Sequence, residues 1–240
     1  MADASTVGRV AGAEHLALAL DTDDMETALR MARQLQPFFG TAKVGLELFS
    51  AAGPEVVSAL ADLDYRVFVD LKMFDIPTTV RKAARVVGAL GASYLTVHAA
   101  GGEPMLSAAV EGLETGAAEV VGVAPVVLAV TVLTSEPVAL PEVLSQRVAM
   151  ATSAGCGGVV CAAPDLALVR SLAPGLRCVV PGIRPHGAAA NDQKRTATPA
   201  EAVGAGAHLL VIGRAVTDAE SPEVVAAQVA AEVASVGDGP

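Results

Sequence analysis

The chain has 240 residues, of which 52% are hydrophobic and 18% are charged, and its 26 acidic residues outweigh its 16 basic ones. Nucleic acids and anionic membranes are bound by basic surfaces, so a net charge of −10 argues against both as partners. The longest uncharged runs, Val86–Gly102 and Val120–Ser135, fall short of the roughly 18 apolar residues that a membrane span needs. Three cysteines without a CxxC pair, and an N-terminus without an apolar leader, predict a cytoplasmic protein.

Short apolar runs alternate with longer amphipathic stretches along the whole chain. The expected strands are His15–Leu20, Ala42–Leu46, Arg66–Leu71, Tyr94–His98, Pro125–Leu133, Gly158–Cys161, Arg177–Val180 and His208–Ile212. The expected helices are Asp23–Gln36, Pro54–Leu63, Ile76–Leu90, Glu103–Thr115, Leu140–Ala154, Pro164–Leu172, Pro199–Ala205 and Pro222–Val233.

Eight strand–helix units, with most strands apolar on both faces, are typical of an α/β protein in which helices cover a parallel sheet. At this length they predict a (β/α)8 TIM barrel. No GxGxxG motif follows the first strand, which argues against a Rossmann fold. We expect a single domain over residues 1–240, with frayed tails at 1–13 and 236–240.

Charged side chains interrupt the second and third strands, where burial makes them costly unless they are paired. Lys43 lies in the second strand, and Asp70 and Lys72 lie two residues apart in the third, so they project to the same side. Asp75 follows within one turn. A structural ion-pair network would explain this pattern, but two lysines and two aspartates converging at one rim favour a site that stabilises a migrating charge.

The last two strands each end in a glycine close to an arginine. Gly182-Ile183-Arg184 follows the seventh strand, and Gly213-Arg214 follows the eighth. Barrels of this kind commonly bind phosphate with these two loops, and the arginine fork can contact two phosphate oxygens at once. The sequence therefore predicts a phosphate site at the loops that follow the seventh and eighth strands.

Asp70-Leu71-Lys72-Met73-Phe74-Asp75-Ile76-Pro77-Thr78-Thr79 resembles the DxKxxDIPxT signature of the orotidine 5′-phosphate decarboxylase family. The resemblance extends from about residue 14 to about residue 230, through Lys43–Gly45, Val97–Ala99, Thr131–Ser135, Gly158–Cys161, Pro181–Pro185, Asp192–Gln193 and Val211–Arg214. Thr78 and Ala100 depart from residues common in the family. The resemblance implies decarboxylation of orotidine 5′-monophosphate (OMP) to UMP and CO₂, without a metal or an organic cofactor.

The resemblance also implies a role for individual residues. Lys72 matches the proton donor to C6, Asp70 the carboxylate that faces the departing carboxyl group, and Lys43 the residue that completes the charged row. Asp75 and Thr79 match residues that each subunit of a homodimer contributes to its partner's site. The expected substrate-binding residues are Asp21, Ile76, Thr79, Thr134, Pro181, Arg184, Gln193, Gly213 and Arg214.

Within this set, Asp21 matches the contact to the ribose hydroxyls. Gln193, Gly213 and Arg214 match the phosphate contacts. Arg184 lies at the base of a segment, Arg184–Thr198, that is expected to close over the phosphate.

The sequence is also compatible with two other functions. The first is a Mg²⁺-dependent phosphosugar decarboxylase or synthase, because such barrels share DxKxxD but lack DIPxT. The second is a nucleotide-binding barrel without catalytic activity. We expect His98 to have a structural role, and the histidines lack the spacing of zinc ligands.

Overall fold

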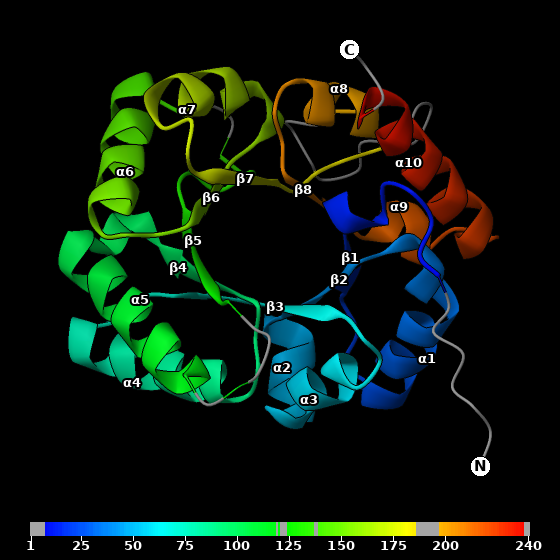
Figure 1. Ribbon diagram of the computed structural model, residues 1–240, viewed down its shortest axis with the longest axis horizontal. Coiled ribbons are helices and arrows are strands. Elements are labelled where there is room, and N and C mark those ends of the chain that lie inside the picture. The colour runs from blue at the N-terminus through cyan, green and yellow to red at the C-terminus, as the bar shows by residue number, and fades with distance from the viewer. Residues whose placement is uncertain (1–7, 119, 121–123, 137–138, 186–196, 238–240) are drawn as a thin grey trace.

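Eight parallel strands close into a barrel in the computed structural model, which describes residues 8–118, 120, 124–136, 139–185 and 197–237 (Figure 1). The strands pair in chain order, and the last pairs with the first. They are β1 (Leu16–Leu20), β2 (Thr41–Gly45), β3 (Arg66–Met73), β4 (Tyr94–His98), β5 (Val126–Val130), β6 (Gly158–Val160), β7 (Arg177–Val180) and β8 (Leu209–Ile212). The predicted (β/α)8 barrel is confirmed.

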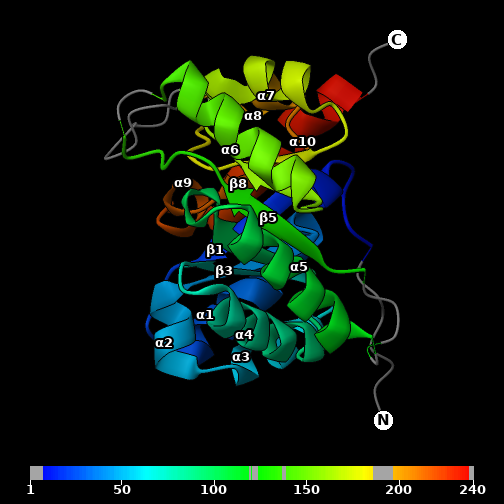
Figure 2. The same ribbon diagram turned by 90° about the vertical axis from the view of Figure 1, so that its left-hand side faces the viewer.

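Helices surround the barrel on its outer side (Figures 1 and 2). They are α1 (Met25–Leu35), α2 (Leu46–Ala52), α3 (Glu55–Ala61), α4 (Pro77–Ala89), α5 (Glu103–Ala117), α6 (Pro141–Ser153), α7 (Leu166–Leu172), α8 (Pro199–Gly204), α9 (Arg214–Thr217) and α10 (Pro222–Gly237). Short 3₁₀ turns lie at Ala13–His15, Gln36–Phe38, Ala99–Gly101 and Ala163–Asp165. The sequence did not predict α2 and α9, which directly follow β2 and β8.

The apolar side chains form two layers, as the alternation along each strand requires. Leu16, Leu18 and Leu20 of β1 point outward and pack against the helices. Ala17 and Ala19 point into the barrel, where the larger rings of Phe68 and Tyr94 fill the interior. Small residues on β1 therefore leave space inside the barrel toward its carboxyl end.

The expectation of a frayed N-terminal tail is wrong for residues 10–13, which are held by backbone hydrogen bonds. The backbone N–H of Val10 donates to Pro37 over 2.9 Å, and the carbonyl of Ala13 accepts from Gly40 over 2.7 Å. Residues 1–7 and 238–240 lie outside the described residues, and α10 continues to Gly237. None of the described helices is long and apolar enough to cross a membrane.

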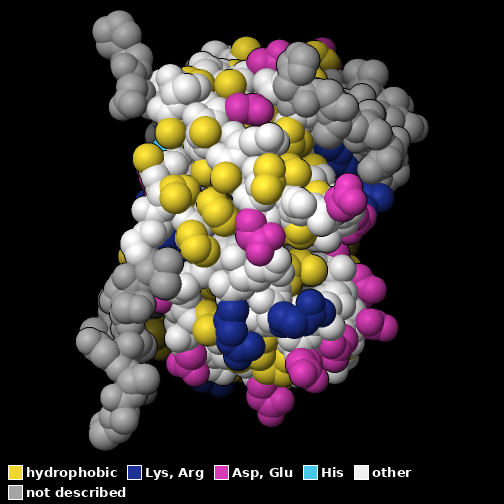
Figure 3. Space-filling model, turned by 90° about the vertical axis from the view of Figure 1, so that its right-hand side faces the viewer, with side chains coloured by type: hydrophobic (Ala, Val, Ile, Leu, Met, Phe, Trp, Pro, Cys, Tyr) yellow, Lys and Arg dark blue, Asp and Glu magenta, His cyan; other side chains and the backbone are white. Residues whose placement is uncertain are grey.

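The face of the molecule formed around α1, α9 and α10 carries both acidic and basic side chains, scattered between apolar and uncharged ones (Figure 3). Alanine and valine make up most of α10, and Val224 is one of its exposed residues.

Candidate active site

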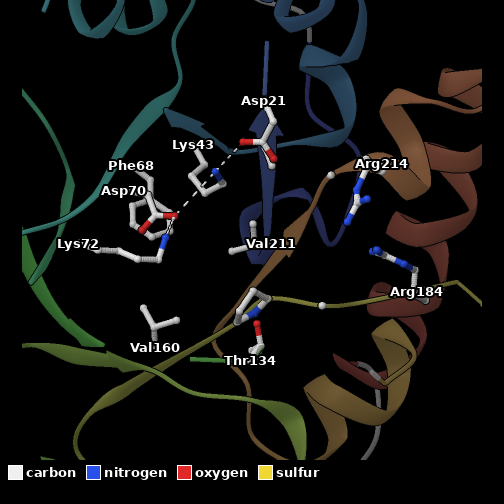
Figure 4. A pocket seen from close by; sticks show the side chains of 14 residues that line it. Asp21, Lys43, Phe68, Asp70, Lys72, Thr134, Val160, Arg184, Val211 and Arg214 are labelled. Carbon is white, nitrogen blue, oxygen red and sulfur yellow. Dashed lines mark hydrogen bonds and ion pairs between the residues drawn. The ribbon is translucent and has the colours of Figure 1, made fainter. Parts of the chain in front are cut away.

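A cavity of about 220 Å³ opens at the carboxyl ends of the strands (Figure 4). It is lined by Ala19, Asp21, Lys43, Phe68, Asp70, Lys72, Thr134, Val160, Pro181, Gly182, Arg184, Val211, Gly213 and Arg214. Six of the segments that carry the family resemblance are far apart in the sequence, and the fold brings residues from all six to this cavity. Phe68, Val160 and Val211 give the cavity an apolar lining, and none of the three was among the expected substrate-binding residues, because each has the pattern of an ordinary core residue of a strand.

Four charged side chains of alternating sign form a row along one wall of this cavity (Figure 4). The Lys43 Nζ lies 3.0 Å from the Asp21 Oδ1 and 3.8 Å from the Asp70 Oδ2, and the Lys72 Nζ lies 2.8 Å from the same Asp70 oxygen. Lys43 and Asp70 are buried, whereas the side chains of Lys72 and Asp21 are 33% and 55% exposed. The buried centre of the row is therefore compensated by pairing, and its ends reach the cavity mouth.

The row contains Asp21 where the sequence led us to expect Asp75. Asp21 ends β1, and β1 pairs with β2 so that Ala19 lies opposite Lys43. A side chain at Gly45 would bring its Cβ within 3.2 Å of the Lys43 Nζ and 3.3 Å of the Asp21 Oδ1. Glycine at this position therefore leaves room for the Asp21–Lys43 ion pair.

The backbone of β3 is irregular where it carries Asp70 and Lys72. Val69 pairs with Leu95 and Met73 with Val97, so three residues of β3 lie opposite the single residue Thr96 of β4. Lys72 has a backbone φ of +48°, a conformation that residues other than glycine seldom adopt. The bulge turns the Lys72 side chain toward Asp70 at the cavity wall.

Thr96 is a further residue of this site that sequence reasoning missed. It is fully buried, its hydroxyl donates to the Asp70 Oδ1 over 2.9 Å, and its oxygen accepts from the Lys72 backbone N–H over 2.9 Å. The only signal in the sequence is a threonine inside an apolar strand, which is also what ordinary strand propensity produces.

Two arginines lie on the side of the cavity away from Lys72 (Figure 4). Arg184, which follows β7, is buried, and Arg214 at the start of α9 is exposed. Their guanidinium groups point toward one another, so both can contact the oxygens of one anion bound between them. This arrangement fits the predicted phosphate site. Gln193 and most of the expected closing segment lie outside the described residues.

Asp75, Ile76 and Thr79 do not reach this cavity in the single chain. All three are exposed, and the Asp75 Oδ1 accepts from the backbone N–H of Ile76. Within a single chain, Asp75 therefore does not join Lys43, Asp70 and Lys72 at the cavity wall. Its role across a dimer interface stays a prediction.

A second cavity of about 400 Å³ also borders Lys72. It is lined by Lys72, Phe74, His98, Ala100, Thr131, Leu133, Glu136 and Arg147. Phe74 beside it and Ile76 nearby in the chain are large apolar residues with 63% and 67% exposure. Lys72 therefore faces two spaces, one within the barrel mouth and one at an exposed apolar rim.

His98 lies in the wall of the second cavity. Burial lowers its pKa below the ordinary 6.5, and the nearby positive charges of Lys72 and Arg147 lower the pKa further. Its ring packs edge-to-face against Phe74, with 6.0 Å between the ring centres. A neutral, packed imidazole fits the structural role that we expected for it.

The comparisons with known proteins agree with this geometry. Residues 14–229 match the model of the family described as Orotidine 5′-phosphate decarboxylase / HUMPS. A protein named orotidine 5′-phosphate decarboxylase from Anaeromyxobacter sp. strain K is 48% identical over 229 residues, which cover 91% of this chain and 97% of that protein. A protein of the same name from Nitratidesulfovibrio vulgaris is 44% identical, with 92% and 98% coverage.

Solved structures give the same result. The crystal structure of orotidine 5′-phosphate decarboxylase from Lactobacillus acidophilus matches with a TM-score of 0.80 and 32% identity, covering 92% of this chain and 99% of that one. On its sequence and on its fold, this chain belongs to the orotidine 5′-phosphate decarboxylase / HUMPS family.

Proposed function

We propose that this protein removes the carboxyl group of orotidine 5′-monophosphate and releases UMP and CO₂, the last step of de novo UMP synthesis. We infer the substrate from the names of its relatives. The row of Asp21, Lys43, Asp70 and Lys72 carries the chemical argument, because it places an ammonium and a carboxylate side by side at a cavity wall. A reaction that builds up negative charge on a carbon needs such a fixed positive charge.

In the proposed step, the bond between C6 of the pyrimidine and its carboxyl carbon breaks. The electron pair stays on C6, CO₂ leaves, and the Lys72 ammonium donates one proton to C6. Lys72 then regains a proton from water, which its partly exposed side chain allows. Asp70, held between Lys43 and Lys72, faces the carboxyl group of the substrate and fixes the direction of the Lys72 ammonium.

The remaining lining residues are proposed to hold the rest of the nucleotide. Arg184 and Arg214 bind the phosphate, with Gly213 giving the phosphate close access to the backbone, and Gln193 adds a further contact. Asp21 accepts from the ribose hydroxyls, while Thr134 and Pro181 lie along the path between the base and the phosphate. Binding energy from the phosphate can then hold the ring against Lys72.

We further propose a homodimer in which the segment with Asp75, Ile76 and Thr79 enters the partner's site. Support comes from the exposure of these residues and from the second cavity, which gives a partner's segment access to Lys72. A carboxylate from the partner would extend the alternating row beyond Lys72. Exposed Phe74 and Ile76 provide apolar area that such an interface would bury.

The proposal includes no metal and no organic cofactor. The Lys43 ammonium lies between the Asp21 and Asp70 carboxylates, so both carboxylates are already paired with a cation of the protein. This favours the decarboxylase over the Mg²⁺-dependent phosphosugar enzymes. Cys156, Cys161 and Cys178 are buried and none of them forms a disulfide, which supports a cytoplasmic location, because thiols persist in a reducing compartment.

The direct test follows the absorbance of OMP with purified protein, with and without EDTA, and measures UMP binding in parallel. We expect conversion to UMP at the same rate in both conditions. UMP binding without conversion would favour the non-catalytic barrel. Absence of both, together with turnover of a phosphosugar that requires added Mg²⁺, would favour the alternative enzyme.

A further inference from the structure

We infer that Thr96 is a positioning residue that sets the geometry of the Asp70–Lys72 pair, an inference that rests on the proposed decarboxylation. Thr96 does not line the cavity, so it acts through its two neighbours. Its hydroxyl is the group that contacts both of them: it binds the Asp70 carboxylate and the Lys72 backbone, each over 2.9 Å.

The geometry of the hydroxyl fixes the direction of each contact. A threonine hydroxyl has one proton to donate and lone pairs to accept with. The Lys72 N–H can only donate, so the hydroxyl proton goes to the Asp70 Oδ1. This leaves the Asp70 Oδ2 directed at the Lys72 Nζ, 2.8 Å away, and at the Lys43 Nζ, 3.8 Å away.

The bulge in β3 explains why a side chain is needed here. Asp70, Leu71 and Lys72 lie opposite Thr96 alone, so the regular ladder of backbone hydrogen bonds is interrupted. The Thr96 oxygen takes the place of a carbonyl acceptor for the Lys72 N–H. It thereby holds Lys72 in its unfavourable backbone conformation, with φ at +48°.

One buried group thus restrains the carboxylate and the backbone of the lysine together. Without the hydroxyl, the Asp70 carboxylate can rotate and the Lys72 backbone can leave its strained conformation. The Lys72 ammonium would then spend less time in the position from which it donates to C6. A displacement of this kind slows the chemical step more than it weakens substrate binding.

The test compares Thr96→Val, which keeps the shape and removes the hydroxyl, with Thr96→Ser, which keeps the hydroxyl. Thr41→Val is the matched control, because Thr41 is equally buried on β2 and its hydroxyl has no hydrogen-bond partner among the described residues. Thr96→Val should lower kcat about 10- to 100-fold, the effect of losing one hydrogen bond to a charged group. The KM for OMP and the Kd for UMP should change less than about threefold.

Thr96→Ser and Thr41→Val should both retain kcat within about threefold of the wild type. Wild-type kcat in Thr96→Val would overturn the inference, and so would a loss in Thr96→Ser as large as that in Thr96→Val. If Thr96→Val does not fold, Thr96→Cys replaces it, because the thiol is a weaker donor. Its kcat should then fall between those of Thr96→Ser and an inactive protein, and a wild-type value would contradict the inference.

The wild-type rate separates this inference from the proposed function. If the wild type does not convert OMP, the proposed function fails. The crystal structure of Thr96→Val then decides the positioning role alone. An unchanged Asp70–Lys72 pair in that structure would overturn it, whereas rotation of the Asp70 carboxylate would support it.

Discussion

At the scale of the residue, burial and pairing determine which variants of the charged row can be interpreted. Lys43 and Asp70 are buried at the centre of the row, so removing Lys43 takes away the cation between Asp21 and Asp70, and removing Asp70 takes away the anion between Lys43 and Lys72. Such variants lose stability as well as activity. Lys72 lies at the exposed end of the row, and its removal leaves Asp70 still paired with Lys43. Lys72 is therefore the member of the row whose removal reports most cleanly on chemistry.

Arg214→Ala tests the phosphate site. We predict that kcat/KM for OMP falls about 100-fold or more, because a charged contact and its contribution to holding the ring are both lost. The matched measurement uses orotidine, which lacks the phosphate. With orotidine the variant and the wild type should react at the same rate. An equal loss with both substrates would place Arg214 outside the phosphate site.

The residues that could be predicted are those whose chemistry is unusual for their setting. Lys43, Asp70 and Lys72 stand out because charges are costly in apolar strands, and the structure places them together. The positive φ of Lys72 and the contacts of Thr96 could not be predicted. They depend on a bulge and on a hydrogen bond between strands, and neither leaves a local pattern in the sequence.

At the scale of the element, α4 and α5 pack closely through glycines. A Cβ added at Gly112 of α5 would lie 2.2 Å from the carbonyl oxygen of Arg81 on α4. Helix propensity alone predicts that Gly112→Ala stabilises the protein by about 1 kcal/mol. Because the obstacle is backbone, we expect the opposite, a loss of about 1–3 kcal/mol in the free energy of unfolding.

Denaturant unfolding measures this difference, and Gly204→Ala in α8 is the control. Its added Cβ would meet only Val236, at 3.9 Å, so that variant should be as stable as the wild type or slightly more stable. A Gly112→Ala protein more stable than the wild type would show that α4 and α5 can separate without cost.

The eight strands were predictable because each is a short apolar run between turn residues, and the structure confirms all eight. The helices that were missed have a common reason. The four-residue α9 is too short to show a helical period, and α2 follows β2 without an intervening loop. Tertiary packing at the strand ends, rather than a local pattern, determines both.

At the scale of the whole molecule, two chains complete one site in the proposed homodimer. A mixture of Lys72→Ala and Asp75→Asn, each inactive alone, should therefore recover activity. With equal amounts and random exchange, half of the dimers are mixed and each has one complete site, so about one quarter of the wild-type activity should return. No recovery after verified subunit exchange would show that Asp75 does not act across an interface.

The central claim is that the Lys72 ammonium at the mouth of this barrel carries the decarboxylation. The most direct measurement is kcat for OMP in Lys72→Ala beside the wild type, with UMP affinity measured to show that the site is intact. We predict that kcat falls by at least about 1,000-fold while UMP still binds, because both the proton donor and the charge that stabilises C6 are removed. A variant that binds UMP and keeps kcat within about tenfold of the wild type would contradict the account.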